Sequence, residues 1–373
     1  MIVIREAKTK REHKKFIQFQ NDLYKNVPQY VPTLMMDELQ NMSPKKNPAY
    51  AYCEMRFFLA EKDGKIVGRV GAIISHKANK LWNQKRIRIT RLDFVEDKAV
   101  FAALMKTVED WAKQKGLTEM IGPIGFCDLD KEGMLVDGFE RPGMFITYYN
   151  HPYYVQFMED YGFVKDADWL EQIVYLDDAK EDKLAALSKR IVEKNGFHIL
   201  EFKNKKELMP YVRPVFELLN TEYEGLYGVV PLTDAQIEYY KEMFITLINL
   251  RYISFITNKE GELVAFGVCA PSLAEAMIKS GGMLFPFGFI PLLKALRKPK
   301  ILDMYIVAVK ESYRKSGLSL VLMQDVYRRA KDDGIALAET GPQLESNHNV
   351  QTMWDYFRTE KEVRRRRSWI KEI

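Results

Sequence analysis

The chain has 373 residues, of which 47% are hydrophobic and 29% charged, and its formal net charge is +5 at pH 7. This composition excludes a disordered chain, and the length exceeds the roughly 250 to 300 residues that one core usually supports, so we expect two domains. The small positive charge, spread along the chain, selects no partner by itself.

Three isolated cysteines and five histidines lack the spacings that are typical of a metal site, so we expect no metal. The odd cysteine count also argues against a disulfide framework and favours a reducing cytoplasm. The sequence begins with the alternating stretch MIVIRE and a charged, helix-like segment, which differs from the apolar core of a signal peptide. We therefore expect a cytoplasmic protein.

Several stretches of the chain recur in the same order. EKDGKIVGRVG (residues 61–71) and NKEGELVAFG (258–267) both predict a β-hairpin with an acidic residue and a glycine in the turn. ALMKTVEDWAKQKG (103–116) and VLMQDVYRRAKDDG (321–334) both predict a helix that closes at a glycine. A strand and a Gly-Pro pair follow each helix. The common order predicts two copies of one α/β unit.

Each copy also opens with a strand followed by helices, and a polar stretch at residues 176–190 joins the two. We therefore expect a first domain at residues 1–190 and a second at 191–373.

In the second copy, ILDMYIVAV (301–309) predicts a strand, and the basic turn YRKSG leads from it into a helix that begins near Gly317. The N-terminus of a helix carries unpaired N–H groups and the positive end of the helix dipole, and a small residue there lets a phosphate approach the backbone. This turn is therefore a candidate phosphate site.

The pattern Arg314-x-x-Gly317-x-Ser319 after a strand resembles the Arg/Gln-x-x-Gly-x-Gly/Ala signature of the GNAT superfamily of acyl-CoA N-acyltransferases, with Ser319 as a departure. In that family the loop binds the pyrophosphate of coenzyme A, and the preceding strand pairs with the pantetheine arm. The resemblance implies that acyl-CoA is held by Val307, Val309, Arg314, Lys315, Ser316, Gly317, Leu318 and Ser319.

A shift of 218 residues places Glu96, Ala99 and Phe101 of the first copy over the residues of this signature. An anion then replaces the arginine, and bulkier groups replace the glycine and the serine, so a pyrophosphate would be repelled. Met158 also stands where the family has its acid tyrosine. We interpret the first domain as a degenerate, non-catalytic GNAT-like copy.

A narrower resemblance covers most of the chain. GPIGFCDLDKEGMLVDGFERPGM and YYNHPYY in the first half, with FGFIPLLKALRK, YRKSG and LESN in the second, resemble the bacterial ceramide synthase-like branch of GNAT proteins. The resemblance implies a tandem duplicated GNAT fold of the α/β (α+β, mixed-sheet) class. It also implies transfer of an acyl group from acyl-CoA, or from acyl carrier protein, to a primary amine, either a sphingoid base or another lipid amine. The alternatives are an inactive GNAT-fold protein that senses an acyl thioester or a lipid, and a tandem-GNAT aminoacyl transferase.

Amide formation from a thioester requires a base for the amine and an acid for the leaving thiolate. The Glu-x-Asn string resembles the branch pattern and makes Glu345 the first candidate for the base, with Asn347 beside it; the alternative is that Glu345 caps a helix or forms a surface ion pair. Tyr356 is the candidate acid or a core aromatic residue. Tyr356 follows Asn349 by seven residues, just as Trp354 follows Asn347, so the register remains open. Further candidates for the base are Asp303, Glu311, Glu339 and His348.

Two other segments have alternative readings. Residues 281–298 are apolar but too short and interrupted to span a bilayer, so they either pack between the domains or form an amphipathic lid that lines an acyl channel or rests on the inner face of the membrane. Arg364 to Arg367 lie in a strand that we expect to end the sheet. Alternation would direct two of these arginines to each face, which disfavours nucleic acid as a partner.

Overall fold

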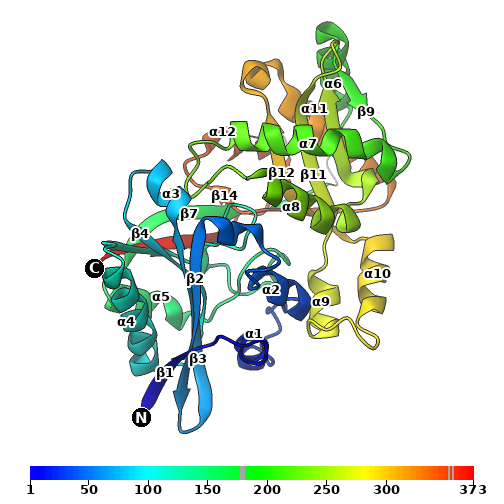
Figure 1. Cartoon of the computed structure of the whole chain (residues 1–373). Helices are drawn as coiled ribbons and strands as arrows, with labels where there is room; N and C mark the ends of the chain where they lie inside the picture. The colour runs from blue at the N-terminus through cyan, green and yellow to red at the C-terminus, as the bar shows by residue number, and fades with distance from the viewer. Residues whose placement is uncertain (177–180, 352, 355–356) are drawn as a thin grey trace.

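The computed structural model describes residues 1–176, 181–351, 353–354 and 357–373. Two sheets, each covered by helices, form its frame, and Figure 1 shows the first half, in blue and cyan, below the second, in green to orange. In the described residues the first sheet has nine strands in the order β1-β2-β3-β4-β5-β16-β7-β14, with β6 paired to β16. The second has seven, in the order β15-β8-β13-β12-β11-β10-β9.

The elements of the first half are β1 (Ile2–Glu6), α1 (Lys10–Leu23), α2 (Met35–Asn41), β2 (Cys53–Lys62), β3 (Lys65–Ser75), α3 (His76–Leu81), β4 (Arg86–Phe94), α4 (Lys98–Gln114), β5 (Glu119–Gly122), β6 (Met134–Asp137), α5 (Tyr153–Asp160), β7 (Val164–Glu171) and β8 (Ile173–Tyr175).

The elements of the second half are α6 (Glu181–Asn195), β9 (His198–Leu200), α7 (Lys205–Glu222), α8 (Asp234–Leu247), β10 (Ile253–Thr257), β11 (Leu263–Pro271), α9 (Ala274–Ser280), α10 (Phe289–Arg297), β12 (Ile301–Val309), α11 (Leu318–Asp332), β13 (Leu337–Thr340), β14 (Gln343–Leu344), α12 (His348–Gln351), β15 (Arg358–Thr359) and β16 (Arg364–Glu372). Short 3-10 turns cover Pro48–Ala51, Leu250–Tyr252 and Glu311–Ser316.

The repeat expected from the sequence is present. The hairpin β2–β3 in the first half matches β10–β11 in the second, and helix α4 matches α11. The one parallel pair described in each sheet, β4 with β5 and β12 with β13, flanks these helices in the chain. Because a parallel pair needs a crossover helix between its strands, α4 and α11 occupy equivalent places.

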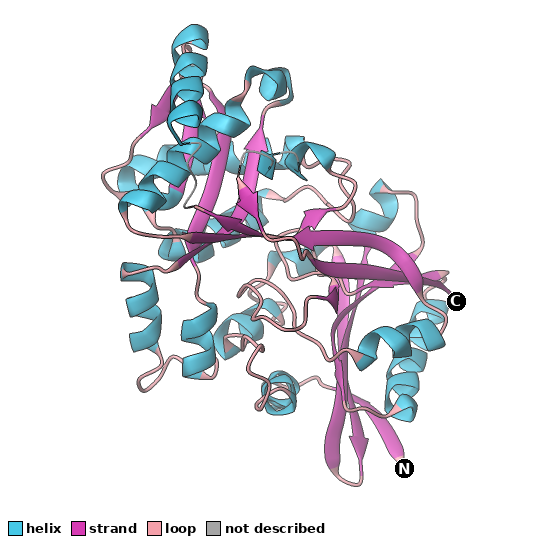
Figure 2. Cartoon of the chain, turned by 180° about the vertical axis from the view of Figure 1, so that it is seen from behind, coloured by secondary structure: helices cyan, strands magenta, loops and turns pink. Residues whose placement is uncertain are grey.

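The two halves exchange strands. Strand β16, at the end of the chain, lies between β5 and β7 in the first sheet, whereas β8 from the first half pairs with β13 in the second. The prediction that the arginine-rich strand ends the sheet is therefore wrong, because β16 lies inside the other sheet. The boundary expected at residue 190 falls within α6, which packs on α11. Figure 2 shows the long strands that cross the molecule between the halves.

The arginines of β16 alternate as expected. Arg364 and Arg366 are buried and form ion pairs with Glu171, while Arg365 and Arg367 face the other side of the sheet and bind Asp168. All four guanidinium groups therefore have carboxylate partners within the protein.

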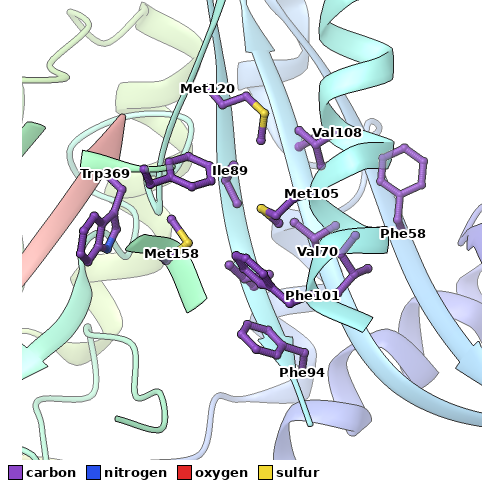
Figure 3. Close-up of a cluster of buried hydrophobic side chains, with 14 of the residues drawn as sticks. Phe58, Val70, Ile89, Phe94, Phe101, Met105, Val108, Met120, Met158 and Trp369 are labelled. Atoms are coloured by element: carbon purple, nitrogen blue, oxygen red, sulfur yellow. The ribbon is translucent and has the colours of Figure 1, made fainter. Parts of the chain in front are cut away.

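The core of the first half closes over the exchanged strand. Figure 3 shows Trp369 of β16 beside Met158 of α5, with Phe94 and Phe101 in the same cluster, and all four side chains are buried. Phe101 and Met158, two of the residues by which the first copy departs from the GNAT pattern, thus serve as packing residues.

Candidate functional site

The site predicted in the second half lies where strands β12 and β13 separate. Their parallel register runs from Ile301 and Leu337 to Met304 and Thr340. The antiparallel pairing of β12 with β11 shifts by one residue at the same level, so that Tyr305 is an extra residue in β12. A bulge of this kind bends a strand and turns it away from its neighbour. Beyond Met304, β12 therefore has its second edge open.

The backbone of Val307 and Val309 faces this open edge. The Lys310 amide donates to the Val264 carbonyl, and in an antiparallel ladder every second residue then points away from the partner strand. In agreement, the hydroxyl of Tyr223, from α7, donates to the outward carbonyl of Val307 at 3.1 Å. Among the described residues no hydrogen bond reaches the outward groups of Val309.

The basic turn that follows β12 is exposed. Residues 310–317 join β12 to α11, and the side chains of Arg314 and Lys315 lie at the surface. Gly317 has φ of 84°, a left-handed conformation that favours glycine, and precedes the first residue of α11. No side chain caps the N-terminus of this helix in the described structure, so its first amides are available to an anion.

Two contacts fix this turn. A Cβ atom at Gly317 would come within 2.7 Å of the Ile191 side chain on α6, so the glycine is also needed for packing. Arg314 binds the buried carboxylate of Glu222, at the end of α7, at 2.7 Å, and the same carboxylate accepts from the Glu311 amide at 3.0 Å. Glu222 therefore holds the turn in place and partly neutralises its arginine.

The predicted catalytic residues are less favourably placed. Glu345 lies beyond β14, which pairs with β7 in the first sheet, and binds Lys165 and Arg365 at 2.5 Å each. Hydrogen bonds from these cations lower the pKa of Glu345. This arrangement agrees with the ion-pair alternative. The backbone carbonyl of Asn347 accepts from the amides of Val350 and Gln351, whereas Tyr356 lies outside the described residues.

The remaining candidates for the base differ in burial. His348 and Glu311 are exposed. By contrast, Asp303 on β12 and Glu339 on β13 are register partners, one residue before the strands separate, and both are buried.

Glu339 has the electrostatics of a group that can gain and lose a proton near neutral pH. Burial and the neighbouring Glu171 carboxylate raise the pKa of Glu339 to about 7, although Arg364 lies 3.2 Å away. Burial, followed by the charge of Glu339, raises the pKa of Asp303 well above its usual range. The sequence offered Glu339 only as one of several carboxylates, because its burial depends on Glu171 and Arg364, both distant in the chain.

The first half carries the same bulge with a closed edge. Arg91 in β4 has φ of 48° where the register with β3 shifts. The outward amide of Phe94 is not available to a ligand, since it donates to the Tyr154 hydroxyl at 2.7 Å, and the Phe94 carbonyl accepts from the Tyr153 hydroxyl at 2.6 Å. The Tyr154 ring stacks on Phe94 with centroids 4.0 Å apart. Side chains of α5 therefore fill this strand edge.

The basic turn that precedes α11 also has no counterpart in the first half. Only residues 95–97 join β4 to α4, and Asp97 caps the helix by accepting from the amides of Ala99 and Val100. A carboxylate thus occupies the place that an anion would need. The first copy therefore lacks the whole turn, a larger difference than the residues at Glu96, Ala99 and Phe101.

No family model matches the chain. Among curated proteins, it is 26% identical over 381 residues to protein YghO of Escherichia coli, covering 100% of this chain and 95% of that one. It is also 26% identical over 338 residues to the bacterial ceramide synthase of Caulobacter vibrioides, covering 89% and 86%. A solved tandem GNAT protein from the clavulanic acid biosynthesis pathway superposes with a TM-score of 0.57 at 13% identity, covering 100% and 98%.

These similarities agree with the duplicated architecture. The likeness to the solved structure shows that the chain has a tandem GNAT fold, and its sheets are of mixed α/β type. No helix in the described part of the chain is both long enough and apolar enough to cross a membrane.

Proposed function

We propose that the protein is an N-acyltransferase whose second half binds acyl-CoA, or the corresponding arm of acyl carrier protein, and transfers the acyl group to a primary amine. The observation that carries this proposal is the continuous path from the bulge at Tyr305, along the open edge of β12, to the uncapped N-terminus of α11. The pantetheine arm would pair with Val307 and Val309. The diphosphate would lie against the amides that follow Gly317, beside Arg314 and Lys315.

The reacting carbonyl would lie near the bulge, where β12 and β13 separate. We assign the role of base to Glu339, in place of Glu345, because Glu339 lies at this point and Glu345 is held in ion pairs on the first sheet. The amine nitrogen forms the new bond to the thioester carbon, the carbon–sulfur bond breaks, and the proton of the amine passes to the Glu339 carboxylate. Asp303, whose pKa burial raises well above its usual range, lies beside Glu339 in the register of the two strands.

The acceptor is proposed to be a lipid amine, with a sphingoid base as the first candidate. This choice rests on the similarity to a protein named bacterial ceramide synthase. Asn347 remains a prediction for a residue that orients the acceptor, and Tyr356 for the acid that protonates the leaving thiolate.

The test has two stages. The unfolding temperature is measured with coenzyme A and with long-chain acyl-CoA, and either ligand should raise it, since a ligand that binds only the folded protein stabilises it. Release of free thiol from acyl-CoA is then followed with sphinganine, and with a short-chain amine as control. No stabilisation by either thioester or coenzyme A would contradict the proposed site.

A second candidate function is that of a binding protein that senses an acyl thioester without turnover. The ion pairs that engage Glu345 favour it, because they occupy the residue that the Glu-x-Asn pattern offers as the base. Stabilisation by acyl-CoA, without release of thiol in the presence of any amine tried, would favour this candidate over the enzyme.

A further inference from the structure

The turn between α9 and α10 exposes a dense group of large apolar side chains. Phe285 and Phe287 at its tip are 78% and 72% exposed. The other exposed members of the group are Met283, Phe289, Ile290 and Leu293. Contiguous exposed apolar groups on a folded protein mark an interaction surface more often than isolated ones do. Figure 1 shows α9 and α10 side by side at the lower right, projecting below the second sheet.

This hairpin is firmly attached at its inner face. Leu292 and Met277 are buried in one cluster with Val31 of the first half. A Cβ atom at Gly282 would come within 2.7 Å of the Thr33 carbonyl, so the turn lies directly on the first half. The inner face therefore packs between the halves, as one of the two sequence-based readings expected, while the outer face presents its apolar residues on a fixed support.

Cations follow the apolar residues along the outer face of α10. Lys294, Arg297 and Lys298 are exposed, and within the described residues no carboxylate forms an ion pair with any of them. Residues four apart lie on one face of a helix, so Phe289, Leu293 and Arg297 form one row, and Ile290, Lys294 and Lys298 form the next. Each step of four residues rises about 6 Å, so the first row changes from apolar to basic within about 12 Å and the second within about 6 Å.

We propose that the α9–α10 hairpin docks the protein on an anionic membrane surface. The phenylalanines at the tip would enter the boundary between headgroups and acyl chains, and the basic rows would lie at the level of the negatively charged headgroups. The basic charge next to the apolar tip is what favours an anionic lipid surface over a second copy of the chain, because two copies of this face would bring like charges together.

Docking here would place the candidate site close to the lipid surface. The hairpin connects β11 to β12, and its two ends meet where Pro271 pairs with Leu302, next to Asp303. With the diphosphate at α11, the acyl end of the donor would point from Val309 toward this end of β12. This last step rests on the proposed function, whereas docking itself does not.

The test measures binding to vesicles without any acyl donor, so it is independent of the proposed activity. The wild type should sediment with vesicles of phosphatidylcholine and phosphatidylglycerol far more than with vesicles of phosphatidylcholine alone, and added salt should weaken this binding. Lys294→Glu/Arg297→Glu should lower the partition coefficient about tenfold or more. Phe285→Glu/Phe287→Glu should abolish binding.

Both double variants replace exposed side chains, so their unfolding temperatures should match that of the wild type. The matched control is Val164→Glu/Met209→Glu, which adds the same charges at positions that are 61% and 42% exposed elsewhere, and it should bind vesicles like the wild type. Equal sedimentation with both kinds of vesicle, or hairpin variants that bind like the wild type, would overturn the proposal. So would a wild-type dimer that Phe285→Glu/Phe287→Glu converts to a monomer without any effect of lipid.

Discussion

Strand β4 of the first half and strand β12 of the second share a bulge, a parallel neighbour and a following helix, but they differ in what occupies their outward edge. At Phe94 two tyrosine hydroxyls bind the backbone, and at Asp97 a side chain caps the helix. In the second half the edge around Val309 and the N-terminus of α11 are left open. The two copies therefore differ in whether the chain's own side chains occupy the strand edge and the first amides of the following helix.

The interior of the two parallel pairs differs as well. In the second half Asp303 faces Glu339, whereas the corresponding pairs in the first half are Ile87 with Met120 and Arg88 with Ile121. Carboxyl groups buried next to each other are costly, and groups with shifted pKa values gather at functional sites. We therefore expect the pair in the second half to serve a purpose that packing alone does not provide.

The largest effect is expected at this pair. Glu339→Gln should lower the rate of acyl transfer by about 10²- to 10⁴-fold, the usual contribution of a general base, whereas Glu345→Gln should change it less than tenfold. In the wild type, kcat/KM should rise with pH through about 7, where Glu339 loses its proton, and this limb should be absent from any residual activity of Glu339→Gln. A greater loss of acyl-transfer rate in Glu345→Gln than in Glu339→Gln would favour Glu345 as the base.

The next largest effect is expected at the basic turn before α11. Gly317→Glu should weaken coenzyme A binding by about a hundredfold or more, because a carboxylate at the helix N-terminus repels the diphosphate. Ser319→Glu tests the same charge without the strain at Gly317 and should act in the same direction. Titration calorimetry measures both.

The matched variant in the first half is Ala99→Glu, at the first turn of α4, where Asp97 already caps the helix. It should leave the affinity for coenzyme A unchanged. Equal losses of affinity for coenzyme A in Ala99→Glu and Ser319→Glu would contradict the assignment of the binding site to the second half.

A third prediction concerns the tyrosines that close the first edge. Tyr154→Phe should lower the free energy of unfolding by about 1 to 3 kcal/mol, because it leaves the buried amide of Phe94 without its acceptor. Tyr223→Phe in the second half should lower the free energy of unfolding by less, since the carbonyl that Tyr223 binds lies on the open edge. Urea denaturation compares the two variants, and a greater loss for Tyr223→Phe would contradict the assignment of open and closed edges.

The smallest effect is expected at Glu222. Removing its charge with Glu222→Gln frees Arg314 from an ion pair whose arginine is 46% exposed, and such pairs contribute little. Coenzyme A should then bind about two- to fivefold more tightly. Weaker binding would instead mean that Glu222 is needed to position the turn.

The sequence predicted the elements whose signals are local. The two hairpins, the two crossover helices and the turn from Arg314 to Ser319 could all be found, because turn residues and apolar periodicity lie within short windows. The cap at Asp97 can also be predicted from the sequence, because an aspartate directly before a helix is a common N-cap. A comparison of the two copies at a fixed shift does not reveal it.

The remaining features depend on distant partners. The alternation of Arg364 to Arg367 fits either sheet, so nothing in β16 alone reveals that it pairs with β5 and β7. The Glu-x-Asn string favoured Glu345 over Glu339, and only the folded chain brings Glu171 to Glu339 and Lys165 to Glu345. The sequence likewise does not predict which face of α10 is exposed, because that depends on where Val31 and Thr33 of the first half lie.

Hydrogen exchange of backbone amides, compared with and without coenzyme A, tests the difference between the halves most directly. We predict that coenzyme A slows exchange at residues 307–319, along the open edge and the first turn of α11, and leaves exchange at residues 93–101 unchanged. Protection at residues 93–101, or no protection in the second half at a saturating concentration of coenzyme A, would contradict this prediction.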